Sequence, residues 1–532
     1  MEVLKKFLLP ALLSLFLSFN SLNSQTKKVE LVQADTARTY TLEEVVVNDF
    51  IGKEKLKKLK EEHFSKAFSG NDLFKASTML PYIKNVIPYI SKIQIDGLSA
   101  DEFSGIWQDN IQILGPATQM LGSLSSINPY LNSIEIHRFP TKYDNLGSAL
   151  EIKKKSFAEE GIETRFYSNL LKRGLVFSMP FNSKAATHVS LTENSIFGFL
   201  KQNVKALKVL PKSIGFQLDS HLEMGKTKLE TSYKRFSEKN DIDEELGGVD
   251  TKMHEDFYQD LFILSYKIPI LGCNIKPNFG YENFKLNTNQ EFSVSADISK
   301  NGLETKTRSF NFGGEISEKN DRYNIGWNTS IIGVDRYNEI KNINITRLWA
   351  EAKPILLGVL FKPSIGITKY KREIKGLGGL STSFFFSKGS IDLGYNYVQN
   401  FLYTNNGFVD EMPIKDGKIV PQTSNRYYLL LEYTTDSEIL KFIDISIYKR
   451  KFNISYFRGE PFQEGYVYGA DLSLSNGHKL GNKIDYKFTC AVSQSRINNH
   501  KLPGASDIAG QFDIMYESSN NLVFSTISSS LP

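Results

Sequence analysis

The chain is poor in the residues that several classes of protein need. Its 532 residues include only two cysteines, Cys273 and Cys490, which are too few for a disulfide framework or a structural zinc site. Basic residues exceed acidic ones by only five and are spread along the sequence, so no nucleic-acid footprint is expected. The seven histidines are scattered, with no pair at the spacing of metal ligands. We therefore predict no metal, no cofactor and no nucleic-acid partner.

Catalytic signatures are also missing. The sequence contains no Gly-x-Ser-x-Gly elbow, no phosphate loop and no dinucleotide fingerprint. Some membrane hydrolases use Ser and His pairs that spacing does not reveal, so an enzyme stays open as an alternative. We nevertheless predict a protein without catalytic residues.

Long apolar runs are scarce as well. The N-terminal run Phe7–Phe19 is too short to cross a bilayer as a helix. It follows Lys5 and Lys6 and precedes the polar residues 21–24, a pattern that predicts a secretory signal peptide at residues 1–24. A buried N-terminal helix is the alternative. The next residues, 25–52, begin with a polar stretch without periodicity, and we expect a flexible segment there, which the family resemblance described below would place in the periplasm.

The chain is rich in features that are typical of β structure. Phe, Tyr and Gly are abundant, at 37, 25 and 37 residues. Along most of the sequence, apolar and polar side chains alternate with a period of two. For example, Tyr323, Ile325 and Trp327 alternate with Asn324 and Gly326. A soluble sandwich would alternate in the same way and is the structural alternative.

Three features favour a membrane barrel over a sandwich. Many alternating runs reach ten or more residues, charged residues occur in mid-strand on the polar side, and aromatic residues recur near strand ends. At roughly 17 residues for a strand and its turn, residues 156–532 predict an all-β membrane barrel of about 22 antiparallel strands. Exposed loops are expected at Ser237–Glu255 and Phe401–Ser424. Because Ser528–Pro532 follow the last alternating run without a terminal aromatic, that strand ends unusually or the sequence is short there.

A smaller unit of a different kind precedes the barrel region. Lys53–Ala67 is rich in helix-forming residues with near-helical spacing of its apolar side chains. Short strands separated by turn residues are predicted at three apolar pairs, Ile93/Ile95, Ile134/Ile136 and Leu150/Ile152. We therefore predict a small α+β domain at residues 53–155.

This domain contains an Asn-Asp-Leu start, a Leu-Pro step, an Ile-Gln-Ile-Asp-Gly-Leu run and the sequence Asn-Pro-Tyr-Leu-Asn-Ser-Ile-Glu-Ile. In order and spacing these motifs resemble the plug domain of TonB-dependent outer-membrane receptors, with a Bacteroidetes-like character. The matching residues are Asp72, Leu73, Pro81, Ile95, Gly97, Ile134, Glu135, Ile136 and Gly147. The resemblance implies that residues 53–155 form a plug inside the lumen of the barrel.

The segment Thr41–Asn48 combines high β propensity with an acidic start. Such a segment suits strand addition to the sheet edge of another protein, although by itself it is more often an ordinary edge strand. The resemblance implies that it is the TonB box, which a TonB-type energising complex grasps in the periplasm. The residues of the box are Leu42, Glu43, Glu44, Val45, Val46 and Val47.

Together these features predict a receptor in the bacterial outer membrane that takes up an unidentified small-molecule or oligomeric ligand. Its partners are the TonB-type complex and the lipids of the outer membrane. Asp96 and Arg138-Phe139-Pro140 depart from the motifs of the family. They favour one alternative, a plugged barrel without transport that is a scaffold for a surface lipoprotein or a secretion partner. A passive porin is the second alternative, which the plug-like domain disfavours.

Overall fold

A computed structural model describes part of the chain, and all of the described residues fall within Leu56–Pro532. The described residues are 83–85, 93–95, 98–99, 105–115, 128, 131–137, 142, 149–154, 162–168, 172–195 and 209–531, apart from 247–248, 295–296, 320–321, 337–338, 357, 406–407, 412–413, 416–417, 438, 458–459, 477–483, 499, 502–506 and 518–521. The predicted signal peptide, the predicted helix at Lys53–Ala67 and the TonB-box residues lie outside them. Within the described part, no helix has the length and apolar character that crossing a membrane requires.

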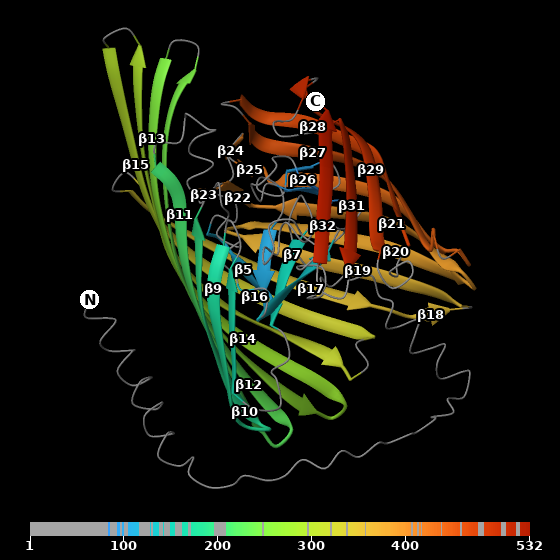
Figure 1. Cartoon of the computed structure of the whole chain (residues 1–532). Helices are drawn as coiled ribbons and strands as arrows, with labels where there is room; N and C mark the ends of the chain where they lie inside the picture. Colours follow the sequence, from blue (N-terminus) through green and yellow to red (C-terminus); the bar gives the residue numbers. More distant parts are fainter. Residues whose placement is uncertain are drawn as a thin grey trace. The chain divides into compact units, whose positions relative to one another are not determined.

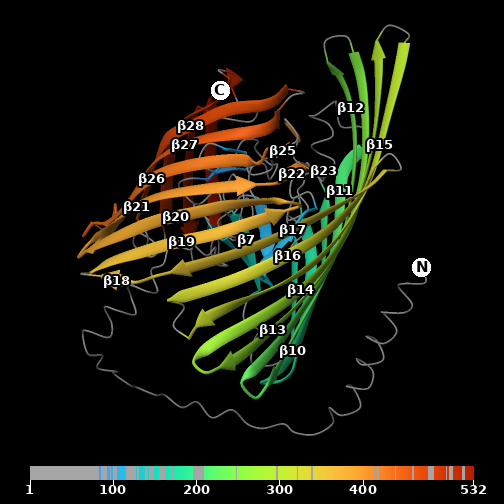
Figure 2. The ribbon, with the colours of Figure 1, turned by 180° about the vertical axis from the view of Figure 1, so that it is seen from behind.

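Most described residues belong to one large antiparallel sheet, which we call the barrel (Figures 1 and 2). Its first strands are β8 (Glu163–Ser168), β9 (Lys172–Asn182), β10 (Ala185–Ser195), β11 (Val209–Met224), β12 (Thr227–Leu246), β13 (Val249–Ile270), β14 (Cys273–Val294) and β15 (Asp297–Glu318). They are followed by β16 (Tyr323–Arg336), β17 (Glu339–Ala352), β18 (Ile355–Leu356), β19 (Val359–Tyr370), β20 (Glu373–Phe386) and β21 (Gly389–Asn400). The last are β26 (Gln422–Thr434), β27 (Phe442–Phe457), β28 (Glu460–Ser475), β29 (Ile484–Ile497), β30 (His500–Lys501), β31 (Ile508–Glu517) and β32 (Leu522–Leu531).

The strand order follows the sequence. It runs from β8 to β21 and then from β26 to β32, and β21 pairs with β26. The order contains 21 strand segments among the described residues, and β18 and β30 are only two residues long. This agrees with the prediction of an all-β chain of about 22 mostly antiparallel strands.

The alternation of side chains along a strand separates an exposed apolar face from a buried polar face. On β15 the outward side chains Phe310 and Phe312 are 42% and 50% exposed, whereas the intervening Ser309 and Asn311 are each 1% exposed. Apolar side chains therefore cover the outer face, and polar ones are buried on the inner face. A water-soluble protein has the reverse arrangement, while a barrel in a bilayer has this one.

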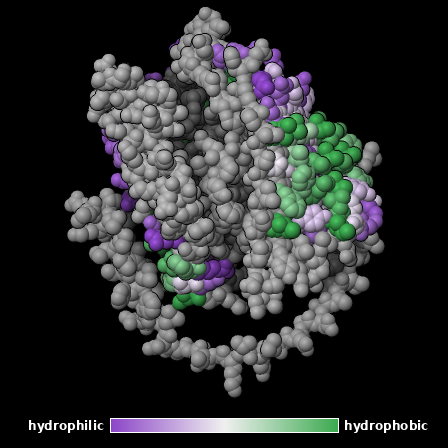
Figure 3. Space-filling view, turned by 45° about the horizontal axis from the view of Figure 1, so that its top comes forward, coloured by the Kyte–Doolittle hydropathy of each residue, from purple (hydrophilic) through white to green (hydrophobic). Residues whose placement is uncertain are grey.

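Aromatic rings line the outer face across neighbouring strands. The rings of Tyr281 and Phe310 lie 5.0 Å apart, and those of Phe279 and Phe312 lie 5.2 Å apart. One pleat further along the same strands, the register pairs Asn283 with Arg308. The apolar surface thus ends at a polar boundary. Figure 3 shows one face of the molecule on which hydrophobic side chains gather beside hydrophilic ones.

The prediction of an exposed loop at Ser237–Glu255 is wrong. Most of these residues extend β12 and β13, which pair in continuous register from Lys228 to Leu246 (Figure 1). Opposite charges meet across this pair, as in Lys239 and Asp256, whose atoms are 3.7 Å apart. Its charged and polar composition resembles that of a loop, although its backbone pairs as two strands.

The prediction of an exposed loop at Phe401–Ser424 is also wrong in part. Two small hairpins form there, β22 (Leu402–Asn405) with β23 (Phe408–Glu411) and β24 (Ile414–Lys415) with β25 (Lys418–Ile419). Phe401 and Leu402 are fully buried, and the ring of Phe401 lies 5.6 Å from that of Tyr370. They complete an apolar cluster on the inner face, which we call the inner apolar cluster, with Leu114, Phe236, Phe257, Phe284, Leu286, Ile332, Val334, Ile343, Ile345 and Tyr370.

Two small sheets precede the barrel in sequence. The first contains β1 (Ile83–Asn85), β2 (Ile93–Ile95) and β3 (Leu98–Ser99). The second, which we call the N-terminal sheet, has the order β5-β4-β7-β6 and contains β4 (Gly105–Gln108), β5 (Ile111–Ile113), β6 (Asn132–His137) and β7 (Ala149–Lys154). The strands predicted at the three apolar pairs are therefore confirmed. β4 pairs with β7 in parallel, and the other pairs are antiparallel.

Candidate functional site: contacts of the N-terminal sheet with the barrel

The tip of the β4–β5 hairpin contacts the inner face of the barrel. Asp109 and Asn110 form the two-residue turn with φ angles of 51° and 62°, a conformation that Asp and Asn tolerate better than most residues. Lys276 of β14 donates to Asp109 Oδ1 at 2.5 Å. Asn278 of the same strand donates to the Asp109 carbonyl at 2.7 Å. The turn thus places one carboxylate against the barrel wall.

Asp109 stays ionised at this buried position. Burial alone would raise its pKa, but the charges of Lys276 and Lys154 outweigh that effect and hold the pKa of Asp109 below its ordinary value. Because the pKa is lower in the folded state, the stabilisation is fully present above the unfolded pKa of about 3.9 and is lost as the pH falls through the folded pKa.

A second contact joins Lys142 to Glu315 of β15. Lys142 Nζ lies 2.8 Å from Glu315 Oε2, and Asn110 donates to the same oxygen at 2.8 Å. Asn324 of β16 donates to the other oxygen at 2.6 Å. Lys142 also lies 5.8 Å from the centre of the Trp349 ring. Burial opposes the charge of Lys142, but Glu315 and Glu151 raise its pKa above the ordinary value, so it is a cation at neutral pH.

The third contact is a carboxylate that accepts consecutive backbone amides. Glu282 of β14 accepts from the N–H of Leu114 at 2.9 Å and from the N–H of Gly115 at 2.8 Å. Gln259 of β13 donates to the same carboxylate at 2.5 Å. A Cβ on Gly115 would meet the Gln259 amide at 2.4 Å, so the glycine permits this close approach.

Further polar contacts continue along the same wall. Arg347 of β17 donates to Gln112 at 3.1 Å and lies 5.4 Å from the ring of Trp107. On the other side, the amides of Asn132 and Gln217 exchange two hydrogen bonds of 2.9 and 3.2 Å. These contacts are polar or ionic and connect β4, β5 and β6 to barrel strands far away in sequence.

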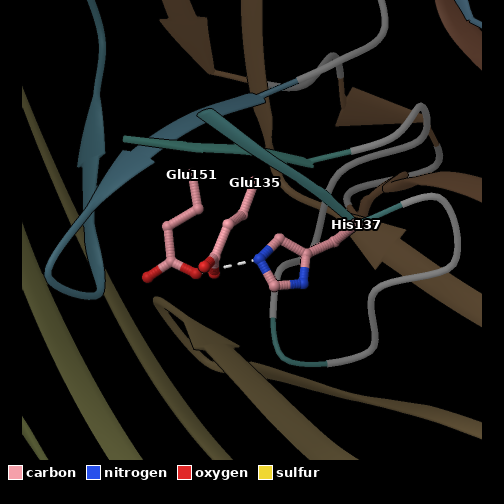
Figure 4. A group of neighbouring side chains, drawn as sticks. All are labelled: Glu135, His137 and Glu151. Atoms are coloured by element: carbon pink, nitrogen blue, oxygen red, sulfur yellow. Dashed lines mark hydrogen bonds and ion pairs between the residues drawn. The ribbon is translucent and has the colours of Figure 1, made fainter. Parts of the chain in front are cut away.

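The N-terminal sheet also brings three metal-ligating side chains together. Glu135 and His137 lie on β6, and Glu151 lies opposite Glu135 on β7. His137 Nε2 is 2.8 Å from Glu151 Oε2 (Figure 4). Lys153 Nζ is 2.5 Å from Glu151 Oε1. Burial raises the pKa of Glu151, but Lys153 and the hydrogen bond from His137 outweigh it, and the pKa lies well below its ordinary value.

The described part of the chain contains only some of the sequence-predicted site residues. Ile95 and Ile134 are buried apolar residues of β2 and β6, and Ile136 lies on β6 with Glu135. Asp72, Leu73, Pro81, Gly97, Gly147 and the TonB-box residues lie outside the described residues. Sequence reasoning missed Glu282, Glu315 and Lys276. The available signal was the presence of charged residues in mid-strand on the polar side.

Solved structures with a similar fold are known for this arrangement of strands. No family model matches the chain, and no curated protein matches its sequence. The ferric-catecholate import receptor Fiu of Escherichia coli K12, in its closed form, superposes with a TM-score of 0.65 at 10% identity, covering 90% of this chain and 86% of that one. The chain has a TonB-dependent receptor-like fold.

Two other solved structures share this receptor-like fold. The ferric enterobactin receptor PfeA of Pseudomonas aeruginosa, in a mutant form, matches with a TM-score of 0.65 at 11% identity, covering 90% of this chain and 86% of that one. FpvA of P. aeruginosa, in a complex with an iron-bound pyoverdine, matches with a TM-score of 0.67 at 8% identity, covering 90% of this chain and 76% of that one. The receptor-like fold is thus shared although sequence identity is low.

Proposed function

We propose that the chain is a TonB-dependent receptor of the bacterial outer membrane, which takes up a ligand with energy supplied from the periplasm. Residues 1–24 direct export, residues 25–52 carry the TonB box at Leu42–Val47, and residues 53–155 are the plug. The plug occupies the lumen of a barrel at residues 156–532. Its partners are a TonB-type complex and the outer-membrane lipids, and the chain performs no chemistry on its ligand.

The observation that carries this proposal is the set of hydrogen bonds and ion pairs between the N-terminal sheet and the barrel, which lie beside the apolar contacts of Ile111 and Leu114. Lys142, Asp109 and Glu282 mediate this contact through hydrogen bonds and ion pairs. Water can replace such partners when the contact opens, whereas opening an apolar contact exposes hydrocarbon to water. A polar contact therefore suits a plug that must move, and the apolar outer face suits a barrel in lipid.

The ligands named for the structural neighbours give a first ligand class to test. Fiu is described as a ferric-catecholate import receptor, PfeA as a ferric enterobactin receptor, and FpvA is bound to an iron pyoverdine. We propose a ferric siderophore as the first ligand class to test for this chain, among small-molecule and oligomeric ligands.

Deletion of Thr41–Asn48 tests the energised mechanism. In a host that depends on this receptor for growth under iron limitation, the deletion should abolish siderophore uptake because the TonB-type complex has no strand to grasp. The barrel should remain inserted and heat-modifiable on gels. Deletion of residues 26–33, which is equally long and lies in the same segment, is the matched control and should leave uptake intact. Uptake at the wild-type rate without Thr41–Asn48 rejects the mechanism.

The inner apolar cluster favours a second candidate function. Phe401 and Leu402 are buried against apolar side chains of the inner wall, including Tyr370. Such a cluster disfavours a water-filled passage at this level. It suits a plugged barrel that moves no solute and is a scaffold for a surface lipoprotein or a secretion partner. Co-purification of a stoichiometric surface lipoprotein, together with no growth defect under any tested nutrient limitation, distinguishes this function from uptake.

A further inference from the structure

A cluster of three possible metal ligands lies on one face of the N-terminal sheet. Glu135 and His137 are two residues apart on β6, so their side chains point to the same face. The register places Glu151 of β7 directly opposite Glu135. Directly paired residues project to one side of a sheet. Figure 4 shows the imidazole ring and the two carboxylates converging there.

The distances fit a metal ion after small side-chain movements. One ligand atom from each residue, a histidine nitrogen or a carboxylate oxygen, lies within 4.8 Å of the others. Ligands of a bound zinc ion sit about 2.0–2.2 Å from it. Atoms that are a few ångströms apart therefore need to close by about 1 Å. Among the residues that the structure describes, this is the only such group of three.

The cluster already attracts a cation. Lys153 Nζ lies 2.5 Å from Glu151 Oε1 and 3.8 Å from Glu135 Oε2. Its side chain is 36% exposed, whereas those of Glu151, Glu135 and His137 are 3%, 14% and 20% exposed. The lysine can therefore turn toward water, while the three ligand side chains are held by the sheet. A divalent ion would replace one ammonium charge with two positive charges.

We propose that Glu135, His137 and Glu151 form a binding site for a divalent first-row transition metal of the zinc type, with water completing the coordination shell. Imidazole together with carboxylate is a donor set that such ions accept, and an open fourth position is common. The bound ion joins β6 to β7 and stabilises the N-terminal sheet. The site is independent of ligand uptake, so it stands whether or not the chain transports a siderophore.

The test uses the purified full-length protein in detergent, with Zn²⁺ in calorimetry and Co²⁺ in visible absorption. We expect one metal ion per chain and the d–d absorption bands of a low-coordinate Co²⁺ site. His137→Gln and Glu151→Gln should each weaken binding at least tenfold. His221→Gln, which changes a histidine outside the cluster, is the matched control and should bind as the wild type does.

A variant with the opposite expected effect separates a metal site from a simple ion-pair cluster. Lys153→Gln removes the competing cation and should tighten Zn²⁺ binding several-fold, because the metal no longer displaces an ammonium group. Tighter binding by Lys153→Gln cannot result from a loss of folded protein, whereas weaker binding by His137→Gln could. No Zn²⁺ binding by the wild-type protein, equal binding by His137→Gln, or Lys153→Gln with unchanged affinity overturns the proposal.

Discussion

Glu282→Ala should open the barrel. The substitution leaves the buried N–H groups of Leu114 and Gly115 and the amide of Gln259 without the carboxylate that accepts from them. A hydrogen bond to a charged group contributes about 1.5–3 kcal/mol, so the loss of one alone corresponds to a roughly tenfold to hundredfold shift toward release of the N-terminal sheet. Planar-bilayer recordings should show more frequent and longer open-channel events than in the wild-type protein.

Two variants control for a general loss of stability. Glu282→Gln keeps an acceptor oxygen in place and should produce a smaller increase in open-channel events. Asn283→Ala changes the neighbouring residue, which belongs to the outer face of the same strand. It should give open-channel events as rare and as short as those of the wild-type protein. If Glu282→Ala stays as closed as Asn283→Ala, the carboxylate does not hold the N-terminal sheet.

Lys142→Glu should have an effect of similar size through charge repulsion. The new carboxylate would face Glu315, whose oxygen now lies 2.8 Å from Lys142 Nζ, and would lie near Glu151. Breaking a buried ion pair on one side costs about 3–5 kcal/mol because the remaining charge loses its partner. We expect proteolysis of the N-terminal domain in membrane vesicles to accelerate at least a hundredfold, with the barrel itself remaining protected.

Charge exchange tests whether the pair itself is responsible. The double variant Lys142→Glu with Glu315→Lys should recover part of the protection, although Glu151 still repels the new carboxylate. Lys388→Glu is the matched control, because it reverses the charge of a lysine whose partner Asp436 is 85% exposed, and such surface pairs contribute little. Failure of the double variant to improve on Lys142→Glu would assign the effect to lost packing against Trp349.

The sequence predicts the two faces of the barrel because alternation has a direct physical cause. Successive side chains of a strand point to opposite sides, so Phe310 and Phe312 could be separated from Ser309 and Asn311 on the sequence alone. The strands of the N-terminal domain at Ile134/Ile136 and Leu150/Ile152 were predicted for the same reason.

The contacts between the N-terminal sheet and the barrel could not be predicted in this way. Asn110 and Glu315 are 205 residues apart, and only the fold brings them together. The cluster of Glu135, His137 and Glu151 depends on the register of β6 against β7, which a search for ligand spacing along the chain does not detect. The extension of β12 and β13 cannot be distinguished from a loop by composition, because what makes it a hairpin is the pairing of one strand with the other.

Cross-linking of β5 to β14 tests the central claim most directly. A Cβ on Gly280 would lie 2.9 Å from Ile111 Cγ2, so cysteines at these two positions are close enough for a disulfide if the N-terminal sheet lies against the inner wall. The experiment uses outer membranes containing Ile111→Cys and Gly280→Cys, with both native cysteines replaced by serine. The account predicts rapid disulfide formation in this pair and none in the control pair of Ile111→Cys with Tyr281→Cys, whose second cysteine is on the outer face. No disulfide in the first pair, or equal formation in both, contradicts it.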